Sequence, residues 1–378
     1  MGKEELNQAK VYNLVKNQLF VLEITLTVLY LLICLMTDLS KSLRNIAYHI
    51  SENTFFAVAM YLFLFFVIGT LVMLPLNFYR GYIIEHKFAL SNLRIEDWIK
   101  KEAKKQMIMF LVLLFMAQVI YILLSVSAGS WWLKAAIIWI VISIFLTKIA
   151  PTVIMPFFYK YKPLNDQTLK RKVFSLAQRT GTNTCNIGII DFSRETKKAN
   201  AAVIGIGKNK RIVFTDTLIE NFYLEEIIVI LAHELAHEKY KHVWRIIFFN
   251  AVGTIIGFYL VGLVFSNSID IFGFYRISDV ANFPLLCLLL FLFGIITMPI
   301  ESHYSRLLEK EADLYALTVT NDPEAFISAM IRLGRQNLAD MQPPKWVEFL
   351  LYDHPSIINR IKMAELFWEK QETKKRFV

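Results

Sequence analysis

Long uncharged apolar segments dominate the pattern of hydrophobic and polar positions along the 378-residue chain. A helix needs about 20 apolar residues to cross a bilayer, and these segments reach or approach that length. Glu23 interrupts the first segment, and Lys134 and Lys148 lie near the ends of the fourth, from where a long side chain can reach the membrane surface. The pattern predicts six membrane-spanning helices, at 19–36, 53–79, 106–133, 131–149, 246–269 and 280–300.

Two polar segments carry the remaining predicted elements. In the first, short β-branched runs precede a helical pattern that starts near Tyr223, with Glu225 and Glu226 in its first turn, where the helix dipole favours acids. Because no glycine or proline follows until Gly253, we expect one uninterrupted helix from this segment into the fifth span. The predicted strands are 186–192, 200–205 and 211–215, and the last two are joined by a turn at Gly207, Lys208 and Asn209.

The composition agrees with a membrane protein. Hydrophobic residues make up 56% of the chain and charged residues only 19%, whereas an ordinary soluble domain carries about 25% charge. The mean hydropathy is +0.44. These values exclude an intrinsically disordered chain, a collagen-like repeat and a small disulfide scaffold.

The positive charge follows the expected membrane topology. The 41 Lys and Arg residues exceed the 32 Asp and Glu residues and give a net charge of +9. Ten of the basic residues lie in the N-terminal segment and the loop at 80–105, and only three lie in the opposing loops. Since basic loops stay in the cytoplasm, we expect the N-terminus, this loop, the segment 150–245 and the tail from Glu301 to be cytoplasmic. The expected partner of the basic residues is membrane lipid and not nucleic acid.

The predicted helix after Tyr223 carries an H-E-x-x-H motif formed by His233, Glu234 and His237. Residues four apart share a helix face, so both imidazoles can bind one ion. Zinc lowers the pKa of a bound water, and Glu234 is placed to take its proton. The alternatives are two solvated histidines on an amphipathic helix, or a structural zinc site in a membrane chamber or transporter. A structural site has no use for Glu234, which favours catalysis.

A catalytic zinc also requires a third protein ligand and an open position. The metzincin spacing would place a histidine at position 243, which holds valine, and His242 is five residues beyond His237, so we assign it to the polar surface. An acidic helical turn follows the sixth span. It could present Glu309 to the ion and Asp313, one turn later, to the free N–H of a ligating imidazole.

H-E-L-A-H together with S-R-L-L-E-K-E-A-D at 305–313 resembles the type I CAAX prenyl proteases and their bacterial relatives, membrane zinc endopeptidases with a glutamate as third ligand. The likeness extends to L-P-L-N-F-Y through I-K-K-E-A-K-K at 74–105, to K-N-K-R-I-V-F-T-D-T-L at 208–218, and to the Y-D-H-P-S element at 352–356. It implies a mainly α-helical polytopic bundle around a chamber, with six spans or the seven described for the eukaryotic enzymes. It also implies a cytoplasmic gluzincin-like zinc protease domain with a small β-sheet.

The resemblance implies a role for each matching residue. His233, His237 and Glu309 would bind one Zn²⁺ per chain, Glu234 would be the general base, and Asp313 would orient a ligand. His354 would stabilise the oxyanion, although it could instead be a histidine at a helix start. Asn200, Ala201 and Ala202 would lie on an edge strand that pairs with an extended substrate, although Asn200 could be a turn residue.

We therefore expect four parts: membrane helices 1 to 4 with the basic loop in 1–150, the protease part with the zinc helix in 151–242, helices 5 and 6 in 243–300, and C-terminal helices in 301–378. The expected function is zinc endopeptidase action on extended substrates, with CAAX-type or prenylated C-termini as the main hypothesis and quality control of membrane proteins as the alternative. The membrane is expected to be a bacterial inner membrane or the endoplasmic reticulum membrane, with the active site facing the cytoplasm.

Overall fold

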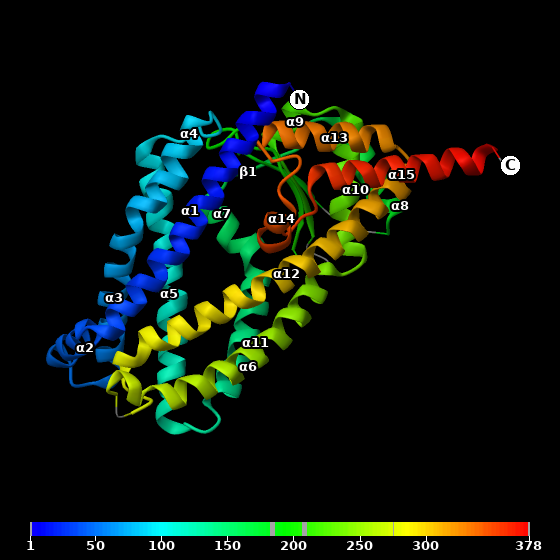
Figure 1. Ribbon diagram of the computed structural model, residues 1–378. Coiled ribbons are helices and arrows are strands. Elements are labelled where there is room, and N and C mark those ends of the chain that lie inside the picture. Colours follow the sequence, from blue (N-terminus) through cyan, green and yellow to red (C-terminus); the bar gives the residue numbers. More distant parts are fainter. Residues whose placement is uncertain (1, 182–185, 206–209, 275, 377–378) are drawn as a thin grey trace.

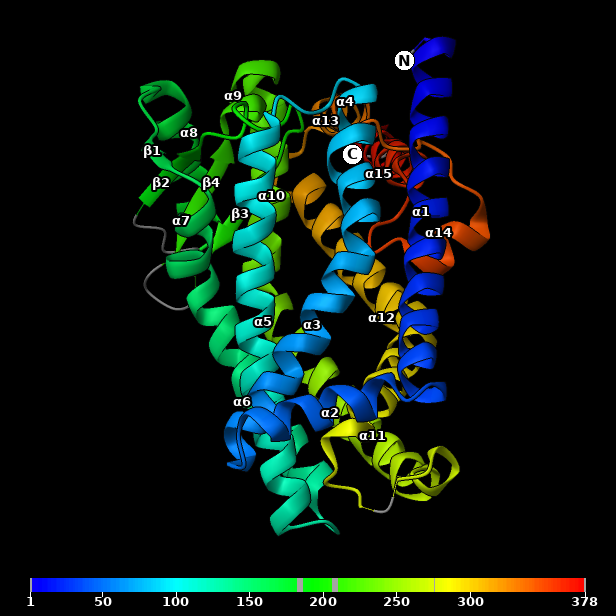
Figure 2. The ribbon, with the colours of Figure 1, turned by 90° about the vertical axis from the view of Figure 1, so that its left-hand side faces the viewer.

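The computed structural model describes residues 2–181, 186–205, 210–274 and 276–376, and most of these residues are helical. Within this part of the chain, six helices are long and apolar enough to cross a membrane, which confirms the predicted number. Figures 1 and 2 show that the spans follow the long dimension of the molecule and that the chain begins and ends toward the same end of it. The six are α1 (Lys3–Met36), Thr54–Lys87, α5 (Ile95–Val126), Trp131–Phe158, α11 (His242–Ser268) and Val280–Thr320.

Three of these spans are built from several elements. Thr54–Lys87 comprises α3 (Thr54–Phe78), η1 (Tyr79–Ile84) and α4 (Glu85–Lys87). Trp131–Phe158 comprises α6 (Trp131–Ile149), η2 (Ala150–Ile154) and α7 (Met155–Phe158), and Val280–Thr320 comprises η4 (Val280–Asn282) and α12 (Phe283–Thr320). The short helices α2 (Leu39–Ile50) and η3 (Asp270–Phe272) lie in the loops at the end of the molecule away from the N-terminus.

Aromatic rings join the spans of the bundle. The ring centroids of Phe65 on α3 and Phe283 on α12 are 5.3 Å apart, and those of Trp131 on α6 and Phe265 on α11 are 6.0 Å apart, both in edge-to-face geometry. Lipid tails are as apolar as these side chains, so close packing and not the hydrophobic effect holds such helices together.

An apolar cavity of about 1000 Å³ lies between α3, α5, α6, α11 and α12. Its walls are mostly hydrophobic side chains, and the polar exceptions are Asn250, Thr254, Thr297 and Glu301. It corresponds to the chamber that the resemblance predicted.

A four-stranded sheet lies beside the spans, with strand order β1-β2-β4-β3. β2 and β4 are parallel, β1 is antiparallel to β2, and β3 is antiparallel to β4, with Ala201 opposite Phe214. β3 is therefore an edge strand. The strands are β1 (Tyr161–Pro163), β2 (Asn186–Ile190), β3 (Ala201–Ile204) and β4 (Arg211–Thr215), and the predicted turn at Gly207, Lys208 and Asn209 lies outside the described residues.

Helices cover the sheet and form the second core of the protein. They are α8 (Gln167–Arg179), α9 (Asp216–Asn221), α10 (Leu224–Lys239) and α13 (Pro323–Gln336). Leu169, Phe214, Leu231 and Phe326, contributed by four different elements, are almost completely buried against one another. The tail ends with α14 (Lys345–Leu351) and α15 (Ile357–Arg376), which returns to pack on α12 and α13.

The predicted continuous helix from Tyr223 into the fifth span is wrong. α10 ends at Lys239 and α11 begins at His242, because Lys241 adopts a left-handed conformation with φ of 54°. For a residue with a Cβ this costs about 1–2 kcal/mol. The neighbouring side chains offset the cost: the Tyr240 ring packs edge-on against Tyr315 and stacks on His242, which is itself buried.

Candidate metal centre

Two helices that pack closely bring the histidines of the H-E-x-x-H motif to the acidic turn. Ala232 and Ala236 on α10 and Ala312 and Ala316 on α12 are all completely buried. Ala236 and Ala312 belong to one buried cluster. Alanines four residues apart on both helices place small side chains at the contact, so the two backbones approach closely. Side chains one turn away can then meet across the contact.

His233 and His237 on α10 converge with Glu309 on α12. Glu309 Oε2 lies 3.1 Å from His233 Nε2, and Glu309 Oε1 lies 3.5 Å from His237 Nε2. The two Nε2 atoms are 3.1 Å apart. Each of the three residues offers one atom to a group that spans no more than 4.8 Å, the arrangement of a metal site.

The donors fit a cation. Two nitrogen lone pairs and a carboxylate face one another, and Glu309 Oε2 is a buried oxygen without a hydrogen-bond donor. Burial and the neighbouring His233 lower the pKa of the His237 imidazole to about 4, so this side chain is neutral, as a metal ligand must be. Two imidazoles and one carboxylate are a ligand set that zinc accepts in catalytic sites.

Asp313 and Arg360 support His233. Asp313 is fully buried, and its Oδ1 lies 2.8 Å from His233 Nδ1, while Arg360 on α15 donates from Nε to Asp313 Oδ2 over 2.8 Å. Burial lowers the pKa of His233, but the hydrogen bond to Asp313 and the nearby carboxylate of Glu309 outweigh it and raise the pKa to about 10. At this pKa the ring binds a proton on each nitrogen, and a metal ion would displace the one on Nε2 while the Nδ1–H stays with Asp313. Arg360 balances the buried carboxylate.

Glu234 faces a cleft of about 350 Å³ next to the metal-binding group. His233, His354 and Arg360 line the same cleft. Burial raises the pKa of the Glu234 carboxyl to about 7. This value suits a group that must accept a proton and then release it near neutral pH.

The tail returns His354 to the metal-binding group. His354 Nε2 lies 3.4 Å from Glu309 Oε2, and its Nδ1 lies 2.8 Å from Asp353 Oδ1. Burial lowers the pKa of His354, but the hydrogen bond to Asp353 and the charge of Glu309 raise it above its usual value. Arg306 on α12 donates to the carbonyls of Glu348 and Phe349 at the end of α14, and so fixes the loop that carries His354.

The start of the edge strand β3 forms another wall of the cleft. Asn200 and Ala201 line the cleft, whereas Ala202 pairs with Val213 in the sheet and lies outside the lining. Asn337, just after α13, bonds both the N–H and the carbonyl of Ala199, at 2.9 and 3.2 Å. The Asn200 side chain accepts a hydrogen bond from the backbone N–H of Ala201.

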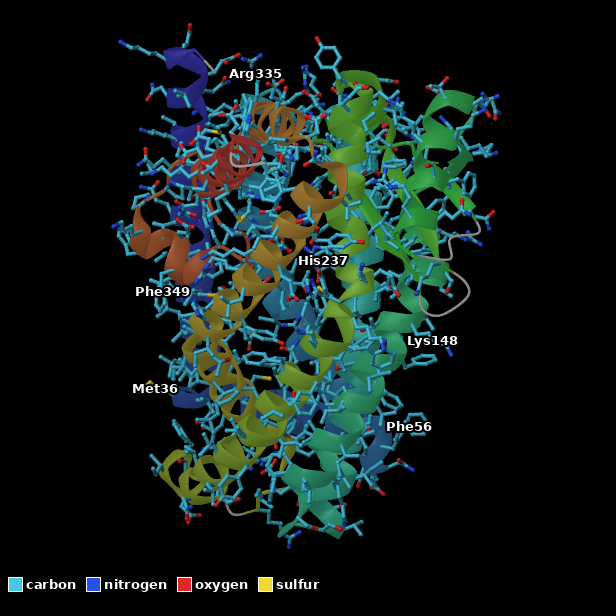
Figure 3. The ribbon with its side chains drawn as sticks, turned by 90° about the vertical axis from the view of Figure 1, so that its right-hand side faces the viewer. Met36, Phe56, Lys148, His237, Arg335 and Phe349 are labelled. Atoms are coloured by element: carbon cyan, nitrogen blue, oxygen red, sulfur yellow. The ribbon has the colours of Figure 1, made fainter. Side chains whose placement is uncertain are left out.

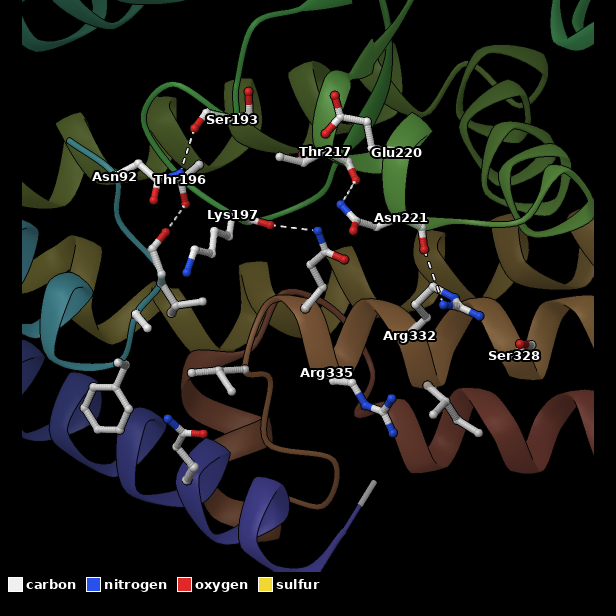
Figure 4. A pocket seen from close by; sticks show the side chains of 17 residues that line it. Asn92, Ser193, Thr196, Lys197, Thr217, Glu220, Asn221, Ser328, Arg332 and Arg335 are labelled. Carbon is white, nitrogen blue, oxygen red and sulfur yellow. Dashed lines mark hydrogen bonds between the residues drawn. The ribbon is translucent and has the colours of Figure 1, made fainter.

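The segment that leads to β3 is held from α13 as well. A hollow of about 660 Å³ lies beside this segment. Gln336 donates to the carbonyl of Lys197 over 2.8 Å at its wall (Figure 4). Arg332 on the same helix is paired with the buried Glu226 at the start of α10. These contacts position the edge strand relative to the helix that carries the motif.

The assignment of His242 to the polar surface is wrong. His242 is 1% exposed, and its Nδ1 lies 2.9 Å from His237 Nδ1. The break in the helix at Lys241 turns the chain, so that His242, five positions after His237, faces the His237 ring. Arg306, Asn337 and Arg360 were also missed, because isolated basic or amide residues give no signal of which distant group they contact.

The centre lies close to the level at which the spans end. In Figure 3, His237 lies between Arg335, near one end of the molecule, and Met36 and Phe56 toward the other. Lys148, in the last turn of α6, lies between the levels of His237 and Phe56 in this view. The metal-binding group thus lies near the junction of the sheet-bearing part of the chain with the spans.

Known families and proteins resemble the chain over nearly its full length. Residues 163–366 match the model of peptidase family M48, and residues 1–160 match the model described as the CAAX prenyl protease N-terminal region with five membrane helices. Within that second range, the described part of this chain has four helices long and apolar enough to span.

Individual relatives come from bacteria and eukaryotes. The uncharacterized metalloprotease YhfN of Bacillus subtilis is 29% identical over 97% of this chain and 86% of that protein. CAAX prenyl protease 1 of Saccharomyces cerevisiae is 28% identical over 81% of this chain and 71% of that protein, and the CAAX prenyl protease 1 homolog of Oryza sativa is 30% identical over 79% and 71%. The crystal structure of S. mikatae Ste24p superposes with a TM-score of 0.82 at 25% identity, covering 96% of this chain and 89% of that one.

Proposed function

The chain belongs to peptidase family M48, and we propose that it hydrolyses extended peptides at a zinc ion held by His233, His237 and Glu309. It is an integral membrane metalloprotease of the CAAX prenyl protease family. One observation carries the assignment of the site. A single cleft joins the motif helix, the edge strand and His354, which come from three separate regions of the sequence.

The side chains of the cleft divide the reaction between them. A bound zinc ion supplies Lewis acidity, which polarises the scissile carbonyl and makes water more acidic. Glu234 takes the proton of the attacking water on its carboxylate and delivers it to the nitrogen of the leaving amine. His354 donates from Nε2 to the oxygen that becomes negative, while Asp353 holds its Nδ1–H. Asp313 and Arg360 keep His233 in the tautomer that binds metal.

The substrate backbone aligns with β3. The strand is at the edge of the sheet, and its first residue, Ala201, lines the cleft, so an extended peptide can continue the sheet past Glu234. Backbone pairing with β3 does not depend on the side chains of the substrate, so another part of the protein must recognise the class of substrate.

We place that recognition in the apolar cavity between the spans. Relatives of the chain are named for prenylated CAAX substrates. Glu301 lines the cavity and precedes Glu309 on the same helix by eight residues, about 12 Å at 1.5 Å per residue. A prenyl chain on a cysteine at the cleaved bond can cover this distance. The cavity volume of about 1000 Å³ and its apolar walls suit such a group.

The test compares farnesylated and unmodified versions of one CAAX peptide. We expect the farnesylated peptide to have the lower KM, because only it fills the cavity. A side chain at Gly253 points into open space in the cavity wall, so Gly253→Leu should raise the KM of the farnesylated peptide at least several-fold and leave that of the unmodified peptide unchanged. Gly129→Leu, also in open space but outside the cavity, is the matched control.

The same comparison distinguishes the prenyl-substrate hypothesis from the alternative function in quality control. Equal kinetics for both peptides, insensitive to Gly253→Leu, would contradict the prenyl hypothesis and favour a quality-control protease that cuts misfolded membrane proteins. A structural zinc site in a transporter predicts no cleavage of either peptide. The family membership and the position of Glu234 in the cleft argue against that reading.

We further propose that the active site faces the cytoplasm, from a bacterial inner membrane or the endoplasmic reticulum membrane. The support is the excess of Lys and Arg in the N-terminal segment and the loop at 80–105. In a variant without the three native cysteines, an impermeant maleimide should label cysteines at positions 100 and 370 from one side of sealed vesicles, and a cysteine at 42 from the other. Labelling of 42 and 100 from the same side would show that the topology is wrong.

A further inference from the structure

We propose that His242 is a positioning residue that fixes the orientation and tautomer of the His237 ligand, with Glu311 and Arg245 as its own support. This inference rests on the proposed metal centre and adds a residue to it. Neither the motif nor its spacing indicates the role, because it depends on the break between α10 and α11.

The break places His242 against the side of His237 that faces away from the metal-binding group. His242 is the first residue of α11, and the left-handed Lys241 before it interrupts the helix. The two Nδ1 atoms are 2.9 Å apart, and the ring of Tyr240 stacks on that of His242. His242 is thereby held in one position and is shielded from water.

A short polar chain continues from His242 toward the surface. Its Nε2 lies 3.3 Å from Glu311 Oε2, on α12 two residues after the ligand Glu309. Arg245, one turn along α11, donates to the same oxygen over 2.6 Å. Glu311 and Arg245 are both more than a third exposed, so they join the buried histidines to solvent.

Metal binding at His237 would set the proton positions along this chain. His237 Nε2 faces His233 and Glu309, so it must be unprotonated to bind metal, and a neutral imidazole then carries its proton on Nδ1. That proton points at His242 Nδ1, which must accept it. His242 therefore carries its own proton on Nε2 and donates to the Glu311 carboxylate. With Nδ1 of His237 protonated, its Nε2 lone pair is kept for the ion.

Each of the two ligand histidines is held by a hydrogen-bonded chain that ends at a carboxylate, and the two carboxylates differ in how deeply they are buried. His233 is held by Asp313, which is completely buried and paired with Arg360. His237 is held by the longer chain through His242 to Glu311. Carboxylates that receive the second N–H of a ligating histidine raise its basicity, and their loss typically weakens metal binding 10–100-fold. His242, between the His237 ligand and the Glu311 carboxylate, raises the basicity of His237 in the same way over one more hydrogen bond.

The test measures zinc affinity of the full-length protein in detergent by competition with a chelating indicator, together with the visible spectrum of the Co²⁺ form. His242→Leu removes the acceptor and should weaken zinc binding about 10–100-fold and alter the Co²⁺ spectrum. His242→Asn offers Oδ1 near the position of Nδ1 and should recover most of the affinity. His303→Leu, a substitution of an exposed histidine on α12, is the matched control and should bind like the parent.

Thermal unfolding of the metal-free variants separates positioning from packing. We expect the Leu and Asn variants to unfold at similar temperatures while their zinc affinities differ. Parent-like affinity in His242→Leu, or an equal loss in the Leu and Asn variants that tracks their unfolding temperatures, would overturn the proposal. If His233→Ala also bound zinc like the parent, the assigned metal centre itself would be wrong. If only His233→Ala lost zinc affinity, the assigned centre would stand and the proposed role of His242 would fall.

Discussion

Glu234→Gln should retain its zinc and lose peptidase activity, with kcat reduced by about 10²–10⁴-fold, the contribution of a positioned general base. The glutamine amide has nearly the same shape as the carboxylate but cannot take a proton from water. Glu234 lines the cleft beside the ligand atoms, and none of the contacts that form the metal-binding group involves its side chain. Rates on a fluorogenic peptide and elemental analysis of the same preparation measure both quantities.

Ligand variants are the control for this result. His233→Ala and Glu309→Ala should lose zinc together with activity, because each supplies one of the three ligand atoms. Loss of activity with full zinc in Glu234→Gln, and loss of both in the ligand variants, separates proton transfer from metal binding. A Glu234→Gln enzyme that cleaves at the parent rate would refute the assigned role, and zinc at full occupancy in both ligand variants would refute the assigned site.

His354→Ala should lower kcat by about 10²–10³-fold with little change in KM, the loss typical of a removed oxyanion donor. His354 Nε2 lies 3.4 Å from Glu309 Oε2 and faces the same cleft as Glu234, so its N–H can reach the carbonyl oxygen that becomes negative. The side chain is half exposed and closes no core, so the variant should fold normally. Steady-state kinetics on a well-cleaved peptide give both constants.

Asn200→Ala is the informative comparison for His354→Ala. Its side chain caps the first N–H of β3, so its loss should disturb the edge that pairs with substrate before the chemical step. We expect a higher KM in Asn200→Ala, and zinc binding like that of the parent in both variants. Parent kcat in His354→Ala would instead assign that histidine to the start of the last helix, and an unchanged KM in Asn200→Ala would make Asn200 a turn residue.

The features that depend only on neighbours along the chain could be predicted from the order of the residues. A span needs only a run of apolar residues of sufficient length, so the number of spans, six, follows from the order of the residues alone. His233 and His237 share a helix face wherever that helix lies, and Glu309 and Asp313 are one turn apart for the same reason. The β-branched runs identified β2, β3 and β4 to within two residues at each end.

Which of these elements meet depends on packing between segments that lie far apart in the sequence. The parallel pairing of β2 with β4, and β1 as a third neighbour, follow from packing against helices and leave no local pattern. The contact of Arg360 with Asp313 joins residues 47 positions apart, and that of His242 with Glu311 joins residues 69 apart. His242 shows the reason most directly. Local rules favour a continuing helix at Lys241, and the burial of His242 together with the packing of the Tyr240 ring on Tyr315 of α12 overrides them.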